Sequence, residues 1–181
     1  MNKTTVKAEP GKQELFIQRE FEAPRELVFR TFTEPKLLAQ WLSPCGMTIH
    51  VEKLEPEGGS WRFIHSTPDG NTFGFHGVMH EVLPPERIIR TFEYEGLPEK
   101  GHVILETLRM ESLPNNRTSV IIQSVFQSVA DRDGMVAAGM ENGTAEAHAL
   151  LDTLLASLRT KAIHKKERPS TDKNLKSLKA W

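Results

Sequence analysis

The sequence predicts an α+β fold in which a curved antiparallel sheet of about seven strands covers one long C-terminal helix. Between Arg132 and Thr160, apolar residues recur at steps of three and four, as on one face of an α-helix. From Met47 to Ser128 the pattern changes to that of strands separated by turns. No crossover helices separate these strands, which argues against a doubly wound nucleotide-binding sheet. The terminal helix is then the large amphipathic element that can cover the apolar sheet face.

The composition is that of one ordinary globular domain. The chain has 181 residues, of which 38% are hydrophobic and 26% are charged, with a formal net charge of −1. Neither nucleic acid nor an acidic membrane surface is therefore expected as a partner. Cys45 is the single cysteine, which excludes an internal disulfide and fits a reducing cytoplasm. The N-terminus carries no apolar targeting segment, and no apolar run is long enough to cross a bilayer.

The N-terminal part predicts a strand followed by two short helices. Residues 1–13 are polar and are expected to form a flexible lead-in. Leu15 to Phe21 alternates in the manner of a strand. Pro24 suits the first turn of a helix, because its missing N–H would have no partner there, and the helix continues over 26–32. A second short helix is expected from Lys36 to Leu42.

Turn-forming residues divide the middle of the chain into six strands. Paired glycines at 58 and 59, the PDGN sequence at 68–71 and paired prolines at 84 and 85 mark three of the turns. Short turns between successive strands predict antiparallel pairing. The expected strands are Met47 to Leu54, Ser60 to Thr67, Thr72 to Val82, Arg87 to Tyr94, His102 to Ser112 and Thr118 to Ser128.

Charge marks both ends of the terminal helix. Asp131 and Asp133 stand where acidic side chains favour the positive end of the helix dipole. After Thr160 lysine and arginine outnumber acidic residues, so 161–181 is expected to be a basic flexible tail. The domain itself is then expected to span 14–160.

Two glycines inside the terminal helix need a compensating reason. Gly139 and Gly143 each cost about 1 kcal/mol relative to alanine in a helix interior. One explanation is tight packing, in which a sheet or loop approaches the backbone closely. The other is a gap left between helix and sheet, with Met135 and Met140 as flexible walls.

Several separated motifs carry a family resemblance. They are FEAPRELVFRTFTEPKLLAQWL, EGGSWRF, PDGNTFGFHGVMHEVLPPERIIRTFEYEG and RDGMVAAGMENG. Together they resemble the START-like (SRPBCC) superfamily, and within it the branch named after the activator of the heat-shock protein 90 ATPase, over residues 15–158. The resemblance implies a helix-grip fold with a hydrophobic cavity between the long helix and the sheet, used in the superfamily for lipids, hormones and polyketides. Relatives commonly carry a tryptophan pair where this chain has Trp41 and Leu42.

The histidines do not form a recognisable metal or catalytic motif. His76 and His80 are four residues apart, which on a strand separates their Cα atoms by about 13 Å, too far to share one ion. A symmetric turn at 68–71 would pair Phe63 with His76 and put His65 diagonally beside His76 on a polar, partly exposed face. No zinc-protease, serine-hydrolase or phosphate-loop motif is present. No metal and no cofactor is expected.

Glu106 is the candidate for a catalytic residue. It lies in the middle of a strand among apolar neighbours, so it is either a buried acid in the cavity or the ion-pair partner of Arg62 or Arg90. Cys45 lies in a loop without a nearby base or cation that would activate its thiol, and is interpreted as incidental.

Bulky apolar side chains on the sheet and helix are the candidates for ligand binding, together with Glu106. The strand pattern does not decide which sheet face is concave, because both faces carry apolar residues. The candidates are Trp41, Trp61, Phe63, Phe75, Phe92, Glu106, Met110, Met135 and Met140.

The leading hypothesis is a non-enzymatic protein that binds a small hydrophobic molecule in this cavity. One alternative is an enzyme of polyketide cyclase or hydrolase type that uses Glu106 or a histidine as acid or base. Another is a chaperone partner that regulates the heat-shock protein 90 ATPase. Exposed sheet edges would also allow a homodimer.

Overall fold

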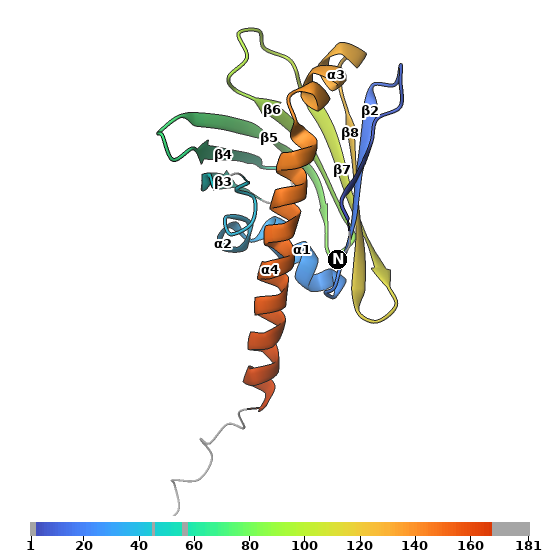
Figure 1. Ribbon diagram of the computed structural model, residues 1–181, viewed down its shortest axis with the longest axis vertical. Helices are drawn as coiled ribbons and strands as arrows, with labels where there is room; N and C mark the ends of the chain where they lie inside the picture. Colours follow the sequence, from blue (N-terminus) through green and yellow to red (C-terminus); the bar gives the residue numbers. More distant parts are fainter. Residues whose placement is uncertain (1–2, 45, 56–57, 168–181) are drawn as a thin grey trace, which may run out of the picture.

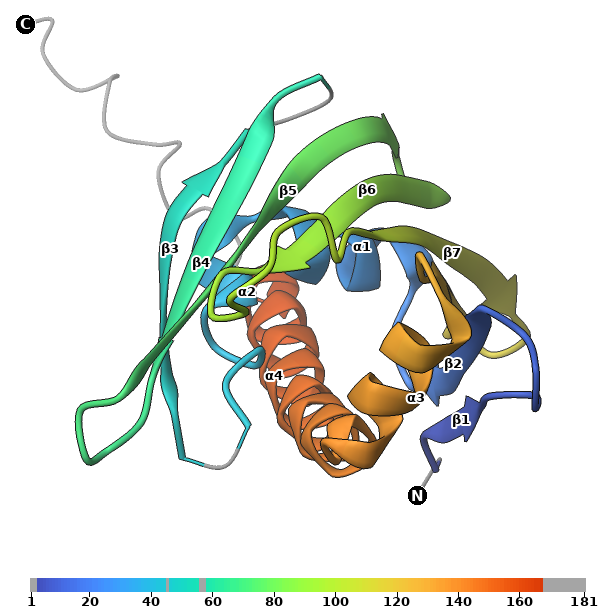
Figure 2. The ribbon, with the colours of Figure 1, turned by 90° about the horizontal axis from the view of Figure 1, so that it is seen from above.

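One open, curved sheet wraps around the C-terminal helix in the computed structural model of the protein (Figure 1, Figure 2). The structure describes residues 3–44, 46–55 and 58–167, with side chains described as far as Lys161. Neighbouring strands all pair antiparallel. In their order across the eight-stranded sheet, they are β1 (Thr5–Lys7), β2 (Glu14–Phe21), β8 (Arg117–Val125), β7 (Ile104–Leu113), β6 (Arg87–Tyr94), β5 (Thr72–Leu83), β4 (Ser60–Ser66) and β3 (Thr48–Leu54).

The helices lie on the concave side of this sheet. Figure 2 shows the last and longest helix running through the space that the sheet encloses, with the two short N-terminal helices beside it. The predicted α+β architecture is therefore confirmed. The helices are α1 (Arg25–Thr33), α2 (Pro35–Leu38), α3 (Val129–Ala137) and α4 (Met140–Glu167).

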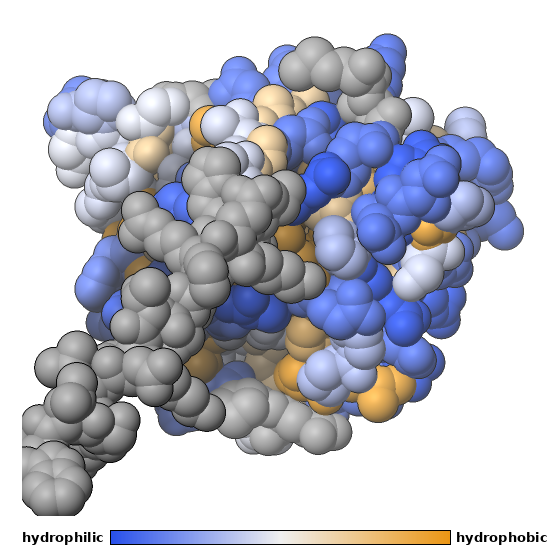
Figure 3. Space-filling view, turned by 90° about the horizontal axis from the view of Figure 1, so that it is seen from below, coloured by the Kyte–Doolittle hydropathy of each residue, from blue (hydrophilic) through white to orange (hydrophobic). Residues whose placement is uncertain are grey.

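The main hydrophobic core fills the space between the middle of α4, α1 and the sheet. Leu151, Leu154 and Leu155 of α4 are buried there against Phe21 and Val28. Their spacing places them on one stripe of the helix, which explains why α4 packs on the sheet in this orientation. The surface seen from below is mostly hydrophilic, with separate small hydrophobic areas (Figure 3).

The predicted single helix from Arg132 to Thr160 is in fact two helices. Gly139 takes φ +82°, a left-handed conformation that ends α3 and starts α4 in a new direction. The first helix also begins earlier than predicted, because the Ser128 side chain accepts a hydrogen bond from the Asp131 amide and caps it. At the other end α4 continues to Glu167, and residues 168–181 of the expected tail lie outside the described residues.

The expected lead-in contains a strand that the sequence pattern did not indicate. β1 pairs with β2, with Val6 opposite Ile17. Arg19 of β2 donates from Nη1 to the Thr4 hydroxyl at 2.9 Å and also binds the Asp152 carboxylate of α4. A strand of three residues is too short to show alternation, so tertiary contacts hold this segment in place.

The free edge of the sheet at β3 is irregular. Its register with β4 shifts between Val51 and Lys53, which is the mark of a β-bulge. Glu52, at the shift, binds Arg62 of β4. A bulge bends and twists the strand locally, so the outer edge of β3 is not a flat ladder of hydrogen-bonding groups.

Candidate functional site

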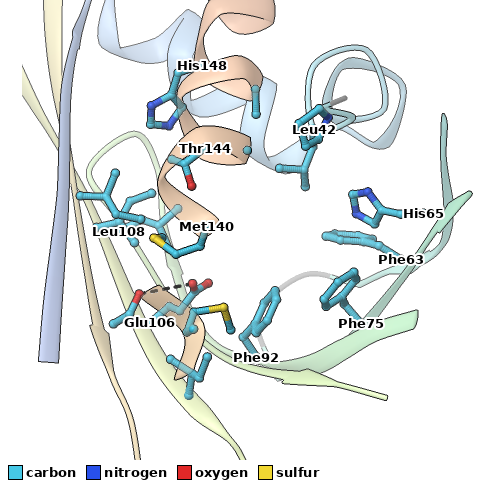
Figure 4. Close-up of a pocket in the computed structure, with 18 of the residues that line it drawn as sticks. Leu42, Phe63, His65, Phe75, Phe92, Glu106, Leu108, Met140, Thr144 and His148 are labelled. Atoms are coloured by element: carbon cyan, nitrogen blue, oxygen red, sulfur yellow. Dashed lines mark hydrogen bonds between the residues drawn. The ribbon is translucent and has the colours of Figure 1, made fainter. Parts of the chain in front are cut away.

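A cavity of about 450 Å³ lies between α4 and the concave face of the sheet (Figure 4). Small-molecule sites commonly occupy roughly 300–1,000 Å³, so its size suits a small ligand. Most of its lining side chains are aromatic or aliphatic and come from both the helices and the strands. The polar side chains among them are His65, Arg90, Glu106, Ser124, Thr144 and His148.

Three phenylalanines from neighbouring strands form one side of the cavity, here called the aromatic wall: Phe63, Phe75 and Phe92. Phe63 and Phe75 are direct partners across β4 and β5, and the ring centroids of Phe75 and Phe92 lie 5.3 Å apart. Trp61 packs beside the wall on the same face of β4, with its ring centroid 4.6 Å from that of Phe63. Offset and tilted ring pairs at these distances attract one another, so the wall is held by its own contacts.

The aromatic wall depends on a strand register that differs from the symmetric-turn prediction. Phe63 pairs with Phe75, not with His76. The last pair before the turn is Ser66 with Thr72, which leaves residues 67–71 in the loop. Because the loop is 67–71 and not the predicted turn at 68–71, the pairing of β4 with β5 differs from the prediction by one residue. A change of one residue in register moves a side chain to the opposite face of the sheet.

His65 and His76 consequently lie on opposite faces of the sheet, so the prediction that they share a polar face is wrong. His65 lines the cavity, where burial lowers its pKa. On the outer face, the ring nitrogens of His76 lie 3.5 Å from the Glu93 carboxylate and 3.3 Å from that of Glu95. The two histidines therefore cannot act together.

Arg90, Glu106 and Ser124 form a polar row across β6, β7 and β8. The register places Glu106 directly opposite both Arg90 and Ser124. Arg90 Nε donates to Glu106 Oε2 at 2.8 Å, and the Ser124 hydroxyl donates to Oε1 at 3.5 Å. Figure 4 shows the second of these hydrogen bonds as a dashed line. The Arg90 guanidinium also lies 4.9 Å from the centre of the Trp61 ring, within range of a cation–π contact. Of the two partners predicted for Glu106, Arg90 is the one present, since Arg62 forms its ion pairs on the outer face.

The helix supplies the opposite side of the cavity with two further polar side chains, Thr144 and His148 (Figure 4). His148 is 2% exposed, and its Nδ1 lies 3.0 Å from the Thr4 hydroxyl. Burial, and after it the charge of Arg19, lower the pKa of His148 to about 4. The imidazole is therefore neutral at neutral pH and adds no charge to the cavity.

The glycines of the predicted helix have two different explanations. Gly143 lines the cavity, and a Cβ added there would meet only Pro44, at 3.8 Å. It leaves a gap rather than permitting a close backbone approach, and Met135 and Met140 do form walls of that gap. Gly139 instead supplies the left-handed turn between the two helices.

Most residues predicted for the pocket line the cavity, but two do not. Trp61 is buried beside the aromatic wall, and Met110 is buried elsewhere in the core. Residue type alone did not separate these core residues from cavity residues. The predicted residues that line the cavity are Trp41, Phe63, Phe75, Phe92, Glu106, Met135 and Met140.

Sequence reasoning did not place His148, Thr144 or Ser124 in the site. A signal for His148 was present, since it stands three residues before Leu151 and four after Thr144, on the apolar side of the helix. A polar residue on a buried stripe needs a partner, and here the partner is Thr4. Ser124 had no such signal, because its place beside Glu106 depends on the pairing of β7 with β8.

Within the ranges that the structure describes, no group of three His, Cys, Asp or Glu side chains is placed to hold a metal ion. Cys45 lies outside those ranges, so the interpretation of its thiol stays a prediction. None of the described helices is both long and apolar enough to span a membrane.

A curved antiparallel sheet that holds a long C-terminal helix, with a cavity between the two, defines the helix-grip fold of the START-like proteins. The sequence supports the same class. The family model described as "Activator of Hsp90 ATPase homolog 1-like protein" matches residues 22–156. The chain therefore belongs to this family, and the predicted resemblance is confirmed.

Solved structures with the same fold come from several bacteria. A protein from Rhodobacter sphaeroides is 29% identical, with a TM-score of 0.76 over 84% of this chain and 98% of the other. A protein from Arthrobacter aurescens is 25% identical, with a TM-score of 0.76 over 84% of this chain and 91% of its own. CalU16 from Micromonospora echinospora, at 18% identity and a TM-score of 0.57 over 92% and 93% of the two chains, shares the fold alone. No curated protein matches the chain.

Proposed function

We propose that the protein binds a small, mainly apolar molecule in the cavity between α4 and the sheet. The observation that carries this proposal is a cavity of about 450 Å³ lined mostly by aromatic and aliphatic side chains. Removing apolar surface from water contributes about 25 cal/mol per Å², so such a lining favours an apolar occupant. Membership of a family with a ligand-binding type of fold supports the same conclusion.

Gly143 gives the proposal further support. A glycine within a helix costs about 1 kcal/mol relative to alanine, and no close backbone contact requires a glycine here. Because the residue lines the cavity, the missing side chain enlarges the space that a ligand would occupy. Closing that space is therefore a direct test.

The test compares leucine at two helical glycines. Gly143→Leu places a side chain in the cavity, whereas Gly134→Leu adds the same side chain at an exposed position of α3 with nothing within 4 Å. We expect the uncharged fluorescent probe N-phenyl-1-naphthylamine to bind the wild-type protein saturably and to bind Gly143→Leu roughly tenfold more weakly. Gly134→Leu serves as the control and should bind as the wild type does. Equal affinity in all three proteins, or no saturable binding by any, would contradict the proposal.

A second candidate function is regulation of a chaperone ATPase, which the description of the family favours. A cytoplasmic location, expected from the single cysteine, would bring the protein together with such a chaperone. The test measures the ATPase rate of the host's Hsp90-type chaperone with and without the protein, using the full chain and a form that ends at residue 160. An unchanged rate with both forms would remove this candidate.

A third candidate is the cyclase or hydrolase type of enzyme, favoured by the presence of His65, Glu106 and His148 around one cavity. The ion pair with Arg90 gives Glu106 a structural role that needs no chemistry. Once a molecule that binds is known, unchanged turnover in Glu106→Gln, His65→Gln and His148→Gln would exclude acid–base catalysis by these groups.

A further inference from the structure

The charges inside the cavity cancel. Among the described lining residues, Arg90 and Glu106 are the side chains that carry full charges at neutral pH, and they pair at 2.8 Å. Both members of the pair are largely buried, with 15% and 14% of their side chains exposed. The two lining histidines, His65 and His148, have pKa values lowered by burial. The cavity therefore presents polar atoms without a net charge.

We infer, on the basis of the binding function proposed above, that the cavity selects uncharged ring compounds that carry a hydroxyl group, and that this hydroxyl donates a hydrogen bond to the Glu106 carboxylate. The aromatic wall holds the ring, and the polar row receives the hydroxyl.

Glu106 has acceptor capacity left for a ligand. An ionised carboxylate offers about four lone-pair sites and no donor, so it binds only groups that donate. Oε2 receives the Arg90 Nε, whereas Oε1 receives, from the part of the chain that the structure describes, only the long contact of 3.5 Å from the Ser124 hydroxyl. A ligand hydroxyl at about 2.7 Å would be a shorter and stronger donor to Oε1.

The same pair disfavours charged ligands. A carboxylate that approached Arg90 would meet Glu106 beside it, while the Trp61 ring occupies a further side of the guanidinium at 4.9 Å. Displacing Glu106 to make room would leave a buried carboxylate without its partner, which is strongly unfavourable. A cationic amine would meet Arg90 in the same way. An uncharged ligand avoids both costs and also loses little hydration on entry.

The position of the phenylalanines favours rings over flexible chains. Figure 4 shows Phe63, Phe75 and Phe92 on one side of the cavity, with Phe92 on the side nearer to Glu106. A flat ring can therefore lie along the aromatic wall while a substituent reaches the carboxylate. Aromatic pairs gain roughly 0.5–1.5 kcal/mol beyond the burial of their area.

The test uses three naphthalenes of nearly equal size: 2-naphthol, 2-methoxynaphthalene and 2-naphthoate. Their affinities are measured by isothermal titration calorimetry at pH 7 with the full-length protein. We expect 2-naphthol to bind about tenfold or more tightly than 2-methoxynaphthalene, which lacks the donor, and 2-naphthoate to bind most weakly. Binding of 2-naphthol and 2-methoxynaphthalene with equal affinity would overturn the inference but leave the binding function in place. Binding of none of the three would count against both.

Two variants assign the selectivity to Glu106. Glu106→Gln removes the charge that balances Arg90, so 2-naphthoate should gain affinity and 2-naphthol should lose about tenfold. Glu95→Gln is the matched control, because Glu95 pairs with Arg62 at 2.7 and 2.8 Å on the outer face. The control should keep the wild-type order. An equal loss for all three ligands in Glu106→Gln would mean that the residue only maintains the fold and would overturn its role in selection.

Discussion

His148 links the cavity to the N-terminal edge of the sheet. Its Nδ1 contacts the Thr4 hydroxyl, which also accepts from Arg19, and Arg19 in turn binds Asp152 one turn along α4 from His148. The imidazole is buried, and its ring meets the Phe21 ring edge-on at 5.5 Å. A proton on this histidine would place a second positive charge beside Arg19. The residue therefore makes the fold sensitive to acid.

The pH dependence of stability tests this sensitivity. The pKa of His148 falls from its ordinary 6.5 to about 4 in the folded protein, so between these values the unfolded chain binds the extra proton. The contribution of His148 to the free energy of unfolding is complete above about pH 6.5 and declines as the pH falls to about 4. Between pH 7.5 and pH 5 the free energy of unfolding should decrease by about 2 kcal/mol from this residue. The measurement is urea unfolding of the wild type and His148→Gln at both pH values.

The comparison depends on the difference between the two proteins, since carboxylates titrate in both. We expect the free energy of unfolding of His148→Gln to change less on acidification than that of the wild type. An identical change in the two proteins would contradict the assignment of acid sensitivity to His148.

At the scale of elements, the junction of α3 and α4 depends on one backbone conformation. Gly139 takes φ +82°, and a methyl group added at its Cα would have no neighbouring atom within 4 Å. The effect of a substitution is therefore set by the strain of the left-handed backbone conformation and not by a clash with neighbouring atoms. Gly139→Ala should destabilise the protein by about 1–2 kcal/mol, the cost of a left-handed alanine. Gly134→Ala, within α3 and equally free of contacts, should stabilise it by about 0.5–1 kcal/mol. Chemical denaturation of both variants measures the contrast, and the same sign for both would contradict it.

The sequence predicted elements well where a pattern was long enough. The six middle strands and β2 each span seven or more residues, and turn-forming residues such as glycine, proline and asparagine separate the middle strands. β1 is too short to show a pattern, and it is held by contacts from Arg19 that no local signal reveals. The break at Gly139 was hidden because the apolar spacing continues across it. The two explanations considered for Gly139 were tight packing and a gap beside the helix, and neither applies, because its left-handed backbone angle forms the turn between α3 and α4.

The candidate site was predicted in part for a similar reason. Aromatic residues and Glu106 stood out by type, and the cavity does contain most of them. Which of them face the cavity depends on the strand register. One additional residue in the loop at 67–71 changes that register, so His76 lies on the outer face, opposite to His65. Trp61 and Phe63 share a face, yet one supports the wall and the other forms it. Both are almost fully buried, and which of them lines the cavity depends on the packing of the folded molecule, which has no counterpart in the strand pattern.

At the scale of the whole molecule, two hydrophobic clusters hold the structure, and both contribute to the cavity lining. Leu151 belongs to the large cluster and does not line the cavity, whereas Leu15 belongs to the small cluster and does. Both are almost fully buried. Leu151→Ala should cost about 4 kcal/mol, and Leu15→Ala about 2 kcal/mol, because a void that joins an existing cavity removes fewer contacts. Urea unfolding compares the two, and equal costs would contradict this division of stability.

An open sheet has two free edges, and β3 forms one of them. A long regular edge is a template on which another chain can add a strand and start a fibril. The bulge between Val51 and Lys53 interrupts that template. The charged side chains of Glu52 and Lys53 also make pairing with a further strand unfavourable. The irregularity of β3 therefore protects concentrated protein against growth of β-aggregates from this edge, and a helix-grip sheet can stay open without a partner strand to close it.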